Sequence, residues 1–411
     1  MSNLFNLINP KEVNQIFISK LEQELVSEKV SLKEATGRIL SQDIESPTNL
    51  PPFTRATMDG YAVKAADTFG ASETKTVYLN LVGEVLMGEE ATQRLESGQT
   101  IKISTGGMLP EGADAVLMVE YTEQLGSDLV EISRAVASGE NVVQQGEDIA
   151  EGEVLLTAGS QLRAQDIGAL AGLGIIEVEV FSQPKVTIFA TGNELISPSQ
   201  TPQLGQIRDI NSYSIASFSQ DLAVVNYGGI IRDNKQELKD KLEGALAESD
   251  LIILSGGSSV GTKDLTLEVV DELGEPGVLV HGISIKPGKP TVLALVDGTP
   301  IIGLPGHPTS AMTVFKIVVQ PVVKILAGLE DKLGKEDNYL TAKLSRNVAS
   351  DKGREEYIRV KLEEQDGFLE AVPVLGKSSL ATTMVEADGL VKIDLGTEGL
   401  EQGTEVRVLM F

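Results

Sequence analysis

The chain of 411 residues contains no cysteine and only two histidines, His281 and His307. The absence of cysteine excludes disulfides, thiolate metal sites and cysteine nucleophiles, and two histidines are too few for a histidine-rich zinc site. Basic residues are scarce as well: 34 Lys and Arg stand against 60 Asp and Glu, a net charge of −26 at pH 7. We therefore expect no nucleic-acid partner. An anionic substrate must be attracted by local Lys and Arg residues, or by a cation held on carboxylates.

Long apolar runs are also missing, since none approaches the roughly 20 residues that a membrane span needs. The first residues, MSNLFNLINPKEVNQIF, lack a basic region followed by an apolar one. We therefore expect a cytoplasmic protein with no membrane partner. The length, with 41 glycines and 41% hydrophobic residues, favours a multidomain α/β or β-rich enzyme.

The first half of the chain predicts one domain inserted into another. Helical periodicity over residues 11–41 and over 160–174 predicts a discontinuous helical linker domain, made of residues 1–50 and 149–180, to which the resemblance described below assigns dimerisation. Between its two parts, residues 51–148 consist of short strands and glycine turns, which is typical of an all-β insertion.

The second half predicts an αβ domain followed by a small β domain. Apolar strands alternate with helices over residues 181–329, as in a doubly wound domain that ends in a long helix over 310–329. The segments of 330–411 have strand character again, and we expect a barrel-like C-terminal domain.

The most informative segment is SGGSSVGTKD, residues 255–264, which follows the apolar strand 251–254 and opens a helix. Glycines at 256, 257 and 261 let the backbone approach a ligand, and the helix start directs free N–H groups at the same place. The segment therefore predicts a phosphate or anion site. It matches neither GxxxxGK[ST] nor GxGxxG, and a tight connection without a ligand is the alternative.

Other loops of the αβ domain should reach the same edge of the sheet, where such folds bind ligands. Three of these loops carry the acids Glu194, Asp233 and Asp264, and converging carboxylates suit Mg²⁺ beside a phosphate. For Asp264, a helix cap is the structural alternative.

Two further loops are suited to an oxyanion. KPGKP, residues 286–290, spaces Lys286 and Lys289 by a turn, although a solvated hairpin is the alternative. In LPGHPTSA, Pro308 suits the first turn of a helix, so that Ser310 and free N–H groups can face an anion; a plain helix start is the alternative.

Nine segments in order resemble a known family: PPFTRATMDGYAV, STGGMLPEGADAVLMVE, GEDI, ATGNEL, IRDINSYSIAS, SGGSSVGTKD, KPGKP, GLPGHPTSAM and GREEYIRV. Together they cover essentially the whole chain. The sequence is similar to the molybdopterin molybdenumtransferase family, often called MoeA, whose relatives include the gephyrin E domain.

The resemblance implies an L-shaped chain of four domains, among them a MogA-like αβ domain, that forms a homodimer. It also implies the reaction: with Mg²⁺ or Zn²⁺ the family hydrolyses the phosphoanhydride of adenylylated molybdopterin. Molybdate enters the released dithiolene, which gives molybdenum cofactor and AMP. Other proteins of molybdenum cofactor biosynthesis are possible further partners.

The resemblance also assigns site residues. Its functional acids fall on Asp59, Asp148, Glu194, Asp233 and Asp264, of which the last three are expected to hold the metal. Its molybdate-contacting pattern falls on Lys286, Lys289, Ser310, Arg354 and either Ser378 or Ser379. The remaining expected ligand contacts lie in the glycine and proline loops, at Thr191, Gly192, Ser255, Gly256, Gly257, Ser258, Gly261, Pro305 and Pro308. Arg354 belongs to the C-terminal domain and Asp264 to the αβ domain, and the resemblance implies that a neighbouring protomer completes such a site.

Three positions depart from the family pattern, and one of them, Gly107 in place of the alanine of many members, is expected to have no consequence. His307 replaces the asparagine of PGNP, which predicts a different helix cap and different local hydrogen bonds. Gly282 stands where some members carry a lysine, so that role is missing or falls to His281. Rival functions are molybdopterin adenylyl transfer, a CinA-like nucleotide hydrolase and a gephyrin-like scaffold, and tungstate can replace molybdate by size and charge.

Overall fold

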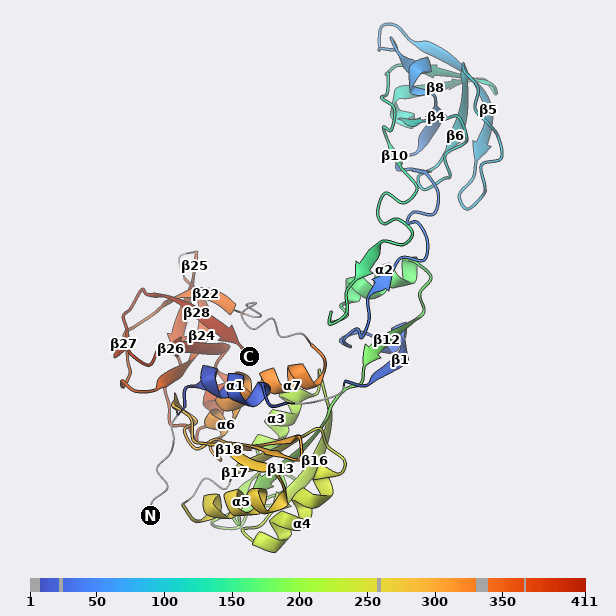
Figure 1. Ribbon diagram of the computed structural model, residues 1–411. Coiled ribbons are helices and arrows are strands. Elements are labelled where there is room, and N and C mark those ends of the chain that lie inside the picture. Colours follow the sequence, from blue (N-terminus) through green and yellow to red (C-terminus); the bar gives the residue numbers. More distant parts are fainter. Residues whose placement is uncertain (1–7, 22–24, 257–259, 330–338, 366) are drawn as a thin grey trace.

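The computed structural model describes residues 8–21, 25–256, 260–329, 339–365 and 367–411, with only the backbone of residues 11 and 260–264. Figure 1 shows an αβ domain beside a small β-barrel, with the β insertion held away from both at the far end of a slender connector. The predicted multidomain architecture is confirmed.

The αβ domain is built on a six-stranded sheet in the order β16-β13-β17-β21-β20-β18. Its first four strands are parallel, as the doubly wound prediction requires, whereas β20 runs antiparallel to both of its neighbours. Apolar runs such as Leu251–Leu254 are buried because helices cover both faces of the sheet. The strands are β13 (Lys185–Thr191), β16 (Val224–Ile231), β17 (Leu251–Gly256), β18 (Pro276–His281), β20 (Val292–Val296) and β21 (Thr299–Leu304).

Two hydrophobic clusters fill the space between this sheet and its helices. On one face the sheet packs against α1 (Pro10–Ile18), α3 (Asn211–Ser219), α6 (Pro308–Val314) and α7 (Gln320–Leu326). On the other face it packs against α4 (Lys235–Leu246) and α5 (Val260–Leu273). The short strands β14 (Leu195–Ile196) and β15 (Ile207–Arg208) pair beside the sheet.

The long helix predicted near the end of this domain is interrupted. A π-helical turn, Phe315–Val319, separates α6 from α7. Pro321, which lacks an N–H and clashes with the carbonyl four residues earlier in a regular helix, accounts for this wider turn. The run Pro308–Leu326 has a mean hydropathy of 1.4, enough in 19 residues to cross a membrane, but 67% of it is buried inside the domain. It is the core helix of the sheet.

The predicted helix over residues 11–41 is largely wrong. Among the described residues of this span, α1 is the one α-helix; its Val13 and Phe17 are fully buried in the αβ domain, whereas Leu25, beyond it, is 38% exposed. Strand β1 (Ser27–Ser31) follows and pairs with β12 (Glu177–Phe181), about 150 residues away. That distant pairing prevails over the local helical periodicity.

The connector is therefore less helical than expected. It contains α2 (Ala164–Gly172), which confirms the predicted second helix, and a 3₁₀ turn, Leu32–Glu34. Two strand pairs complete it: β1 with β12, and β2 (Ile44–Glu45) with β11 (Val154–Leu156). Its small core gathers around Leu40, Leu162 and Leu170.

The β insertion contains a six-stranded sheet in the order β7-β4-β6-β5-β9-β8, which confirms its all-β character. Exposed residues alternate with buried or half-buried ones along its longest strand, β5, so that one side of that strand faces a core. Its strands are β3 (Arg55–Ala56), β4 (Gly60–Val63), β5 (Val77–Val85), β6 (Gln99–Ile103), β7 (Ala115–Met118), β8 (Thr122–Leu125), β9 (Leu129–Ile132) and β10 (Val142–Val143).

The C-terminal domain is a barrel of five strands, closed by the pairing of β24 with β26. The αβ domain adds a short strand to it: in β19 (Ile285–Lys286), Lys286 lies opposite Glu356 of β24. This pairing brings the predicted lysine turn against the barrel. The barrel strands are β22 (Tyr339–Leu344), β24 (Glu355–Gln365), β25 (Phe368–Pro373), β26 (Gly389–Ile393) and β28 (Glu405–Met410), beside the short pair β23 (Val348–Ala349) and β27 (Gly399–Leu400).

Candidate functional site

A cleft of about 410 Å³ lies where the αβ domain meets the barrel. The αβ domain contributes the lysine turn and Ser310, and the barrel contributes Arg354, Glu356 and the loop that ends at Ser378. The cleft thus gathers the predicted oxyanion ligands Lys286, Lys289, Ser310, Arg354 and Ser378. Ser379, the alternative to Ser378, is not among its lining residues.

The lysine turn has a shape that only glycine permits. Gly288 has a φ of +124°, and a Cβ atom there would overlap the side chain of Val314 on α6. The Thr291 hydroxyl donates a hydrogen bond of 2.7 Å to the Gly288 carbonyl and closes the turn. Lys286 and Lys289 are therefore presented from a turn that packs closely on α6.

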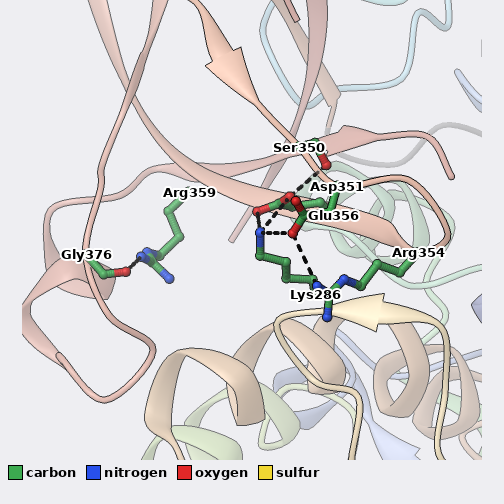
Figure 2. A network of polar contacts seen from close by, with 7 residues as sticks. All are labelled: Lys286, Ser350, Asp351, Arg354, Glu356, Arg359 and Gly376. Atoms are coloured by element: carbon green, nitrogen blue, oxygen red, sulfur yellow. Dashed lines mark hydrogen bonds and ion pairs between the residues drawn. The ribbon is translucent and has the colours of Figure 1, made fainter. Parts of the chain in front are cut away.

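Carboxylates of the barrel contact two cations of this cleft, Lys286 and Arg354 (Figure 2). Lys286 Nζ lies 3.0 Å from Glu356 Oε1 and 3.5 Å from Asp351 Oδ2. Arg354 Nη2 lies 3.3 Å from the same Asp351 oxygen, and the Ser350 hydroxyl donates to Glu356 at 2.7 Å. The Glu356 side chain is only 12% exposed, so it is a nearly buried partner of Lys286.

Glu356 and Asp351 are not among the predicted site residues, because an oxyanion site predicts cations and hydroxyls rather than carboxylates. The acidic pair in GREEYIRV was a signal that could have been used. Arg359 was missed as well: it lines the cleft, is 8% exposed, and donates through Nη2 to the Gly376 carbonyl at 3.0 Å. The cations Lys286, Lys289, Arg354 and Arg359 outnumber the two carboxylates Asp351 and Glu356 by two, a balance suited to a dianion.

The start of α6 holds the serine loop of the barrel. His307 Nδ1 lies 2.8 Å from the Ser378 hydroxyl oxygen. The Thr309 backbone N–H and hydroxyl donate to the Ser378 carbonyl at 3.2 and 3.0 Å. His307 is the N-cap residue of α6, but its side chain makes no capping hydrogen bond to the helix. It bonds Ser378 of the barrel domain instead, so the local hydrogen bonds differ from those of a capping asparagine.

The carboxyl edge of the parallel sheet assembles the other predicted loops. Thr191 ends β13, and Ser255 and Gly256 end β17. A Cβ atom on Gly256, whose φ is +118°, would overlap the Thr191 carbonyl. The Asn211 amide donates to Ser255 Oγ at 2.8 Å and to the Gly306 carbonyl at 2.9 Å, which ties the loops after β17 and β21 together.

Two predicted acids share this edge. The pKa of Asp233 is raised, first by partial desolvation of its carboxylate and then by the negative charge of Glu194. Arg232 braces their loop by donating to the carbonyls of Asn193 at 2.7 Å and Leu195 at 3.1 Å. Two oxygen-bearing acids that repel each other fit a hard cation such as Mg²⁺.

The third expected metal ligand cannot be placed, because the side chain of Asp264 lies outside the described residues. Gly257 and Ser258 lie outside them too, and of Gly261 the structure describes only the backbone, within α5. Among the residues that are described, no group of three or more acids or histidines is placed to hold a metal. The metal set of Glu194, Asp233 and Asp264 stays a prediction.

The remaining acids, Asp59 and Asp148, are exposed at the β insertion. The Thr105 backbone N–H and hydroxyl donate to Asp59 at 2.7 and 2.9 Å and hold its pKa below the ordinary value. Figure 1 shows this domain far from the αβ domain and the barrel of its own chain, whose residues line the cleft. Arg354, by contrast, lines one cleft with Lys286 of the same chain, which argues against our expectation that it serves a neighbouring protomer.

Comparison with known proteins agrees with this arrangement. Residues 8–174 match the family model described as "MoeA N-terminal region (domain I and II)", residues 187–325 match "Probable molybdopterin binding domain", and residues 341–411 match "MoeA C-terminal region (domain IV)".

Relatives match along nearly the whole chain. A molybdopterin molybdenumtransferase of Nostoc is 33% identical over 398 residues, which cover 95% of this chain and 90% of that protein. One from Haemophilus influenzae is 34% identical over 335 residues, 81% of this chain and 80% of the relative. The crystal structure of a MoeA molybdopterin biosynthesis protein from Pyrococcus horikoshii superposes with a TM-score of 0.86 at 30% identity, covering 99% of this chain and 100% of that one. The chain therefore belongs to the MoeA family.

Proposed function

We propose that this protein is a molybdopterin molybdenumtransferase that inserts molybdate into adenylylated molybdopterin and releases AMP. The observation that carries the proposal is the cleft between the αβ domain and the barrel. In a chain of net charge −26, this cleft concentrates Lys286, Lys289, Arg354 and Arg359 beside the hydroxyls of Ser310 and Ser378. Such a set attracts a compact dianion by charge and binds its oxygens by hydrogen bonds.

The proposal assigns the oxyanion and the adenylylated pterin to two neighbouring sites. The cleft cations and hydroxyls hold the oxyanion, whereas the loops after β13, β17 and β21 bind the phosphates and the pterin. Glu194 and Asp233, with Asp264, would hold Mg²⁺ or Zn²⁺, which supplies positive charge to the phosphoanhydride. Asn211 keeps two of these loops together by bonding both Ser255 and Gly306.

The test is molybdate-dependent release of AMP from adenylylated molybdopterin, with and without Mg²⁺. Replacing both Lys286 and Lys289 by Ala should raise the molybdate requirement about tenfold or more, because charge-assisted hydrogen bonds are lost. Binding of the adenylylated pterin should change little. The control is Lys33→Ala, which replaces an exposed lysine of the connector.

Three results would count against the proposal. Adenylyl transfer to molybdopterin in place of AMP release would favour the adenylyltransferase alternative, and no turnover at all would favour a scaffold. Equal loss of molybdate and pterin binding in the lysine variant would assign the turn to the phosphates. Competition between molybdate and tungstate at limiting concentration decides which oxyanion is preferred.

The proposal includes a homodimer in which the β insertion of one copy reaches the cleft of the other. Its support is that the insertion, which carries Asp59 and Asp148, lies away from the αβ domain and the barrel of the same chain in Figure 1, and the cleft is lined by residues of those two domains. If these acids act at the cleft, a second copy must bring them there, and a two-fold axis would build two equal sites.

A cytoplasmic location completes the proposal. An adenylylated substrate must come from a reaction that consumes a nucleoside triphosphate, and such reactions depend on the cytoplasmic nucleotide pool. Cell fractionation would test this directly.

A further inference from the structure

The hydrogen bond between His307 and Ser378 joins the αβ domain to the wall of the cleft. His307 Nδ1 lies 2.8 Å from Ser378 Oγ, across 71 positions of sequence. Ser378 lines the cleft, whereas His307 does not. The backbone of Ser378 is held separately, by the N–H and hydroxyl of Thr309 at 3.2 and 3.0 Å. The imidazole therefore acts on the hydroxyl of a serine whose main chain is already anchored.

The direction of this hydrogen bond decides what the cleft offers to a ligand. A serine hydroxyl has one hydrogen to donate and two lone pairs. If Nδ1 accepts that hydrogen, the hydroxyl turns only lone pairs toward the cleft, and these repel an anion. If Nδ1–H donates to Oγ, the hydroxyl hydrogen is free to point into the cleft.

The surrounding charges favour the second arrangement once an anion is bound. The cleft cations Lys286 and Arg354 attract a species that brings oxygens and no hydrogens of its own, so every ligand contact must be a donor on the protein side. The exposed His307 ring can meet water with its Nε2 atom in either tautomer. The tautomer with hydrogen on Nδ1 therefore loses no hydrogen bond at Nε2.

We propose that His307 is a positioning residue that donates its Nδ1 hydrogen to Ser378 and thereby turns the Ser378 hydroxyl into the cleft as an oxyanion donor. The identity of the oxyanion rests on the proposed function, but the hydrogen-bond geometry does not. The residue at 307 must be a donor of suitable reach. The side-chain amide of asparagine can meet this requirement, whereas leucine cannot.

A double-mutant cycle in the full-length protein tests the proposal. The variants are His307→Leu, Ser378→Ala and both together, with molybdate binding measured by calorimetry and the molybdate KM by AMP release. Each single change should weaken molybdate binding about tenfold and raise KM more than it lowers kcat, since one hydrogen bond to a charged group is lost. The double variant should be no worse than either single one. Ser127→Ala, an exposed serine of the β insertion, is the control.

Rescue and folding are checked in the same series. His307→Asn should restore molybdate binding to within about twofold of wild type, because its amide donates in place of the ring. All variants should keep the wild-type midpoint of thermal unfolding, since Thr309 still anchors the loop. Because the chain has only two histidines, ¹⁵N-histidine NMR can also assign the tautomer, and molybdate should leave hydrogen on Nδ1 of His307.

Several outcomes would overturn the proposal. These are unchanged molybdate binding in His307→Leu, losses that multiply in the double variant, failure of His307→Asn to rescue, or an unprotonated Nδ1 in the molybdate complex. If wild type binds molybdate and His307→Leu binds it equally well, only the role of His307 is rejected. If wild type binds no molybdate or tungstate, the proposed function is rejected together with it.

Discussion

At the level of single residues, the charge of the oxyanion cleft depends on its carboxylates as well as on its cations. Lys286 is not a bare charge, because it contacts Glu356 and Asp351 of the barrel. These carboxylates hold the ammonium in place, but they also compete with an incoming anion for it. The carboxylates therefore lower the affinity of the cleft for an anion while they fix the position of the Lys286 ammonium.

We predict that Glu356→Gln strengthens molybdate binding about tenfold, because it removes one negative charge from beside a dianion site. Sulfate binding should strengthen in parallel, so that selectivity does not improve. Calorimetric titration of both oxyanions measures the change. Glu363→Gln is the matched control: it lies on the same strand, β24, but pairs with the exposed Lys361. Weaker molybdate binding in Glu356→Gln would mean that the carboxylate mainly orients Lys286.

At the scale of elements, a turn and a helix together build the αβ side of the cleft. The turn from Lys286 to Pro290 approaches α6 so closely that Gly288 has no room for a side chain. The turn begins in β19, which pairs with β24 of the barrel. The same few residues therefore connect the αβ domain with the barrel. The position of the lysines thus depends on this packing as well as on their sequence.

We predict that Gly288→Ala destabilises the protein by about 1–3 kcal/mol more than Gly298→Ala does. Both glycines have positive φ, +124° and +90°, but a Cβ atom on Gly298 would meet nothing within 4 Å. The difference therefore isolates the clash with Val314. Chemical denaturation measures it, and the molybdate requirement should rise only in Gly288→Ala. Equal destabilisation by both changes would contradict the prediction, because it would show that the turn moves away from Val314 with no loss of stability.

At the scale of the whole molecule, the shape keeps the β insertion away from the cleft of its own chain. Lys286 and Arg354 lie together in one chain, so they cannot complement each other between protomers. Asp59, on the insertion, is the residue for which complementation is expected.

Mixing Asp59→Asn and Arg354→Ala subunits in equal amounts should restore about a quarter of wild-type activity from two inactive parents. About half of the dimers are then mixed, and each mixed dimer has one site with an intact cleft and an intact insertion. Mixing Asp264→Ala with Arg354→Ala should restore nothing, since both residues belong to the two domains that meet at the cleft within one chain. Activity in that second mixture, or none in the first after verified exchange, would contradict the shared site.

Features that follow from local patterns are already visible in the sequence. Buried strands such as Leu251–Gly256 are visible as apolar runs, and glycine turns mark where such strands end. Because parallel strands end at one edge, the loops at Thr191, Asp233 and Ser255 can be grouped from the order of strands and helices along the chain. The ordered motifs identified the family over the whole chain.

Which distant surfaces meet is apparent only in the folded protein. Pairing of β1 with β12 replaced a predicted helix, and β19 joined a barrel that begins about fifty residues later. Likewise, nothing local reveals that Glu356 contacts Lys286 or that His307 contacts Ser378. Periodicity and turn chemistry are properties of neighbouring residues, whereas these contacts arise when two separately folded surfaces pack. The charge and hydrogen-bond pattern of the cleft is therefore settled by packing between domains.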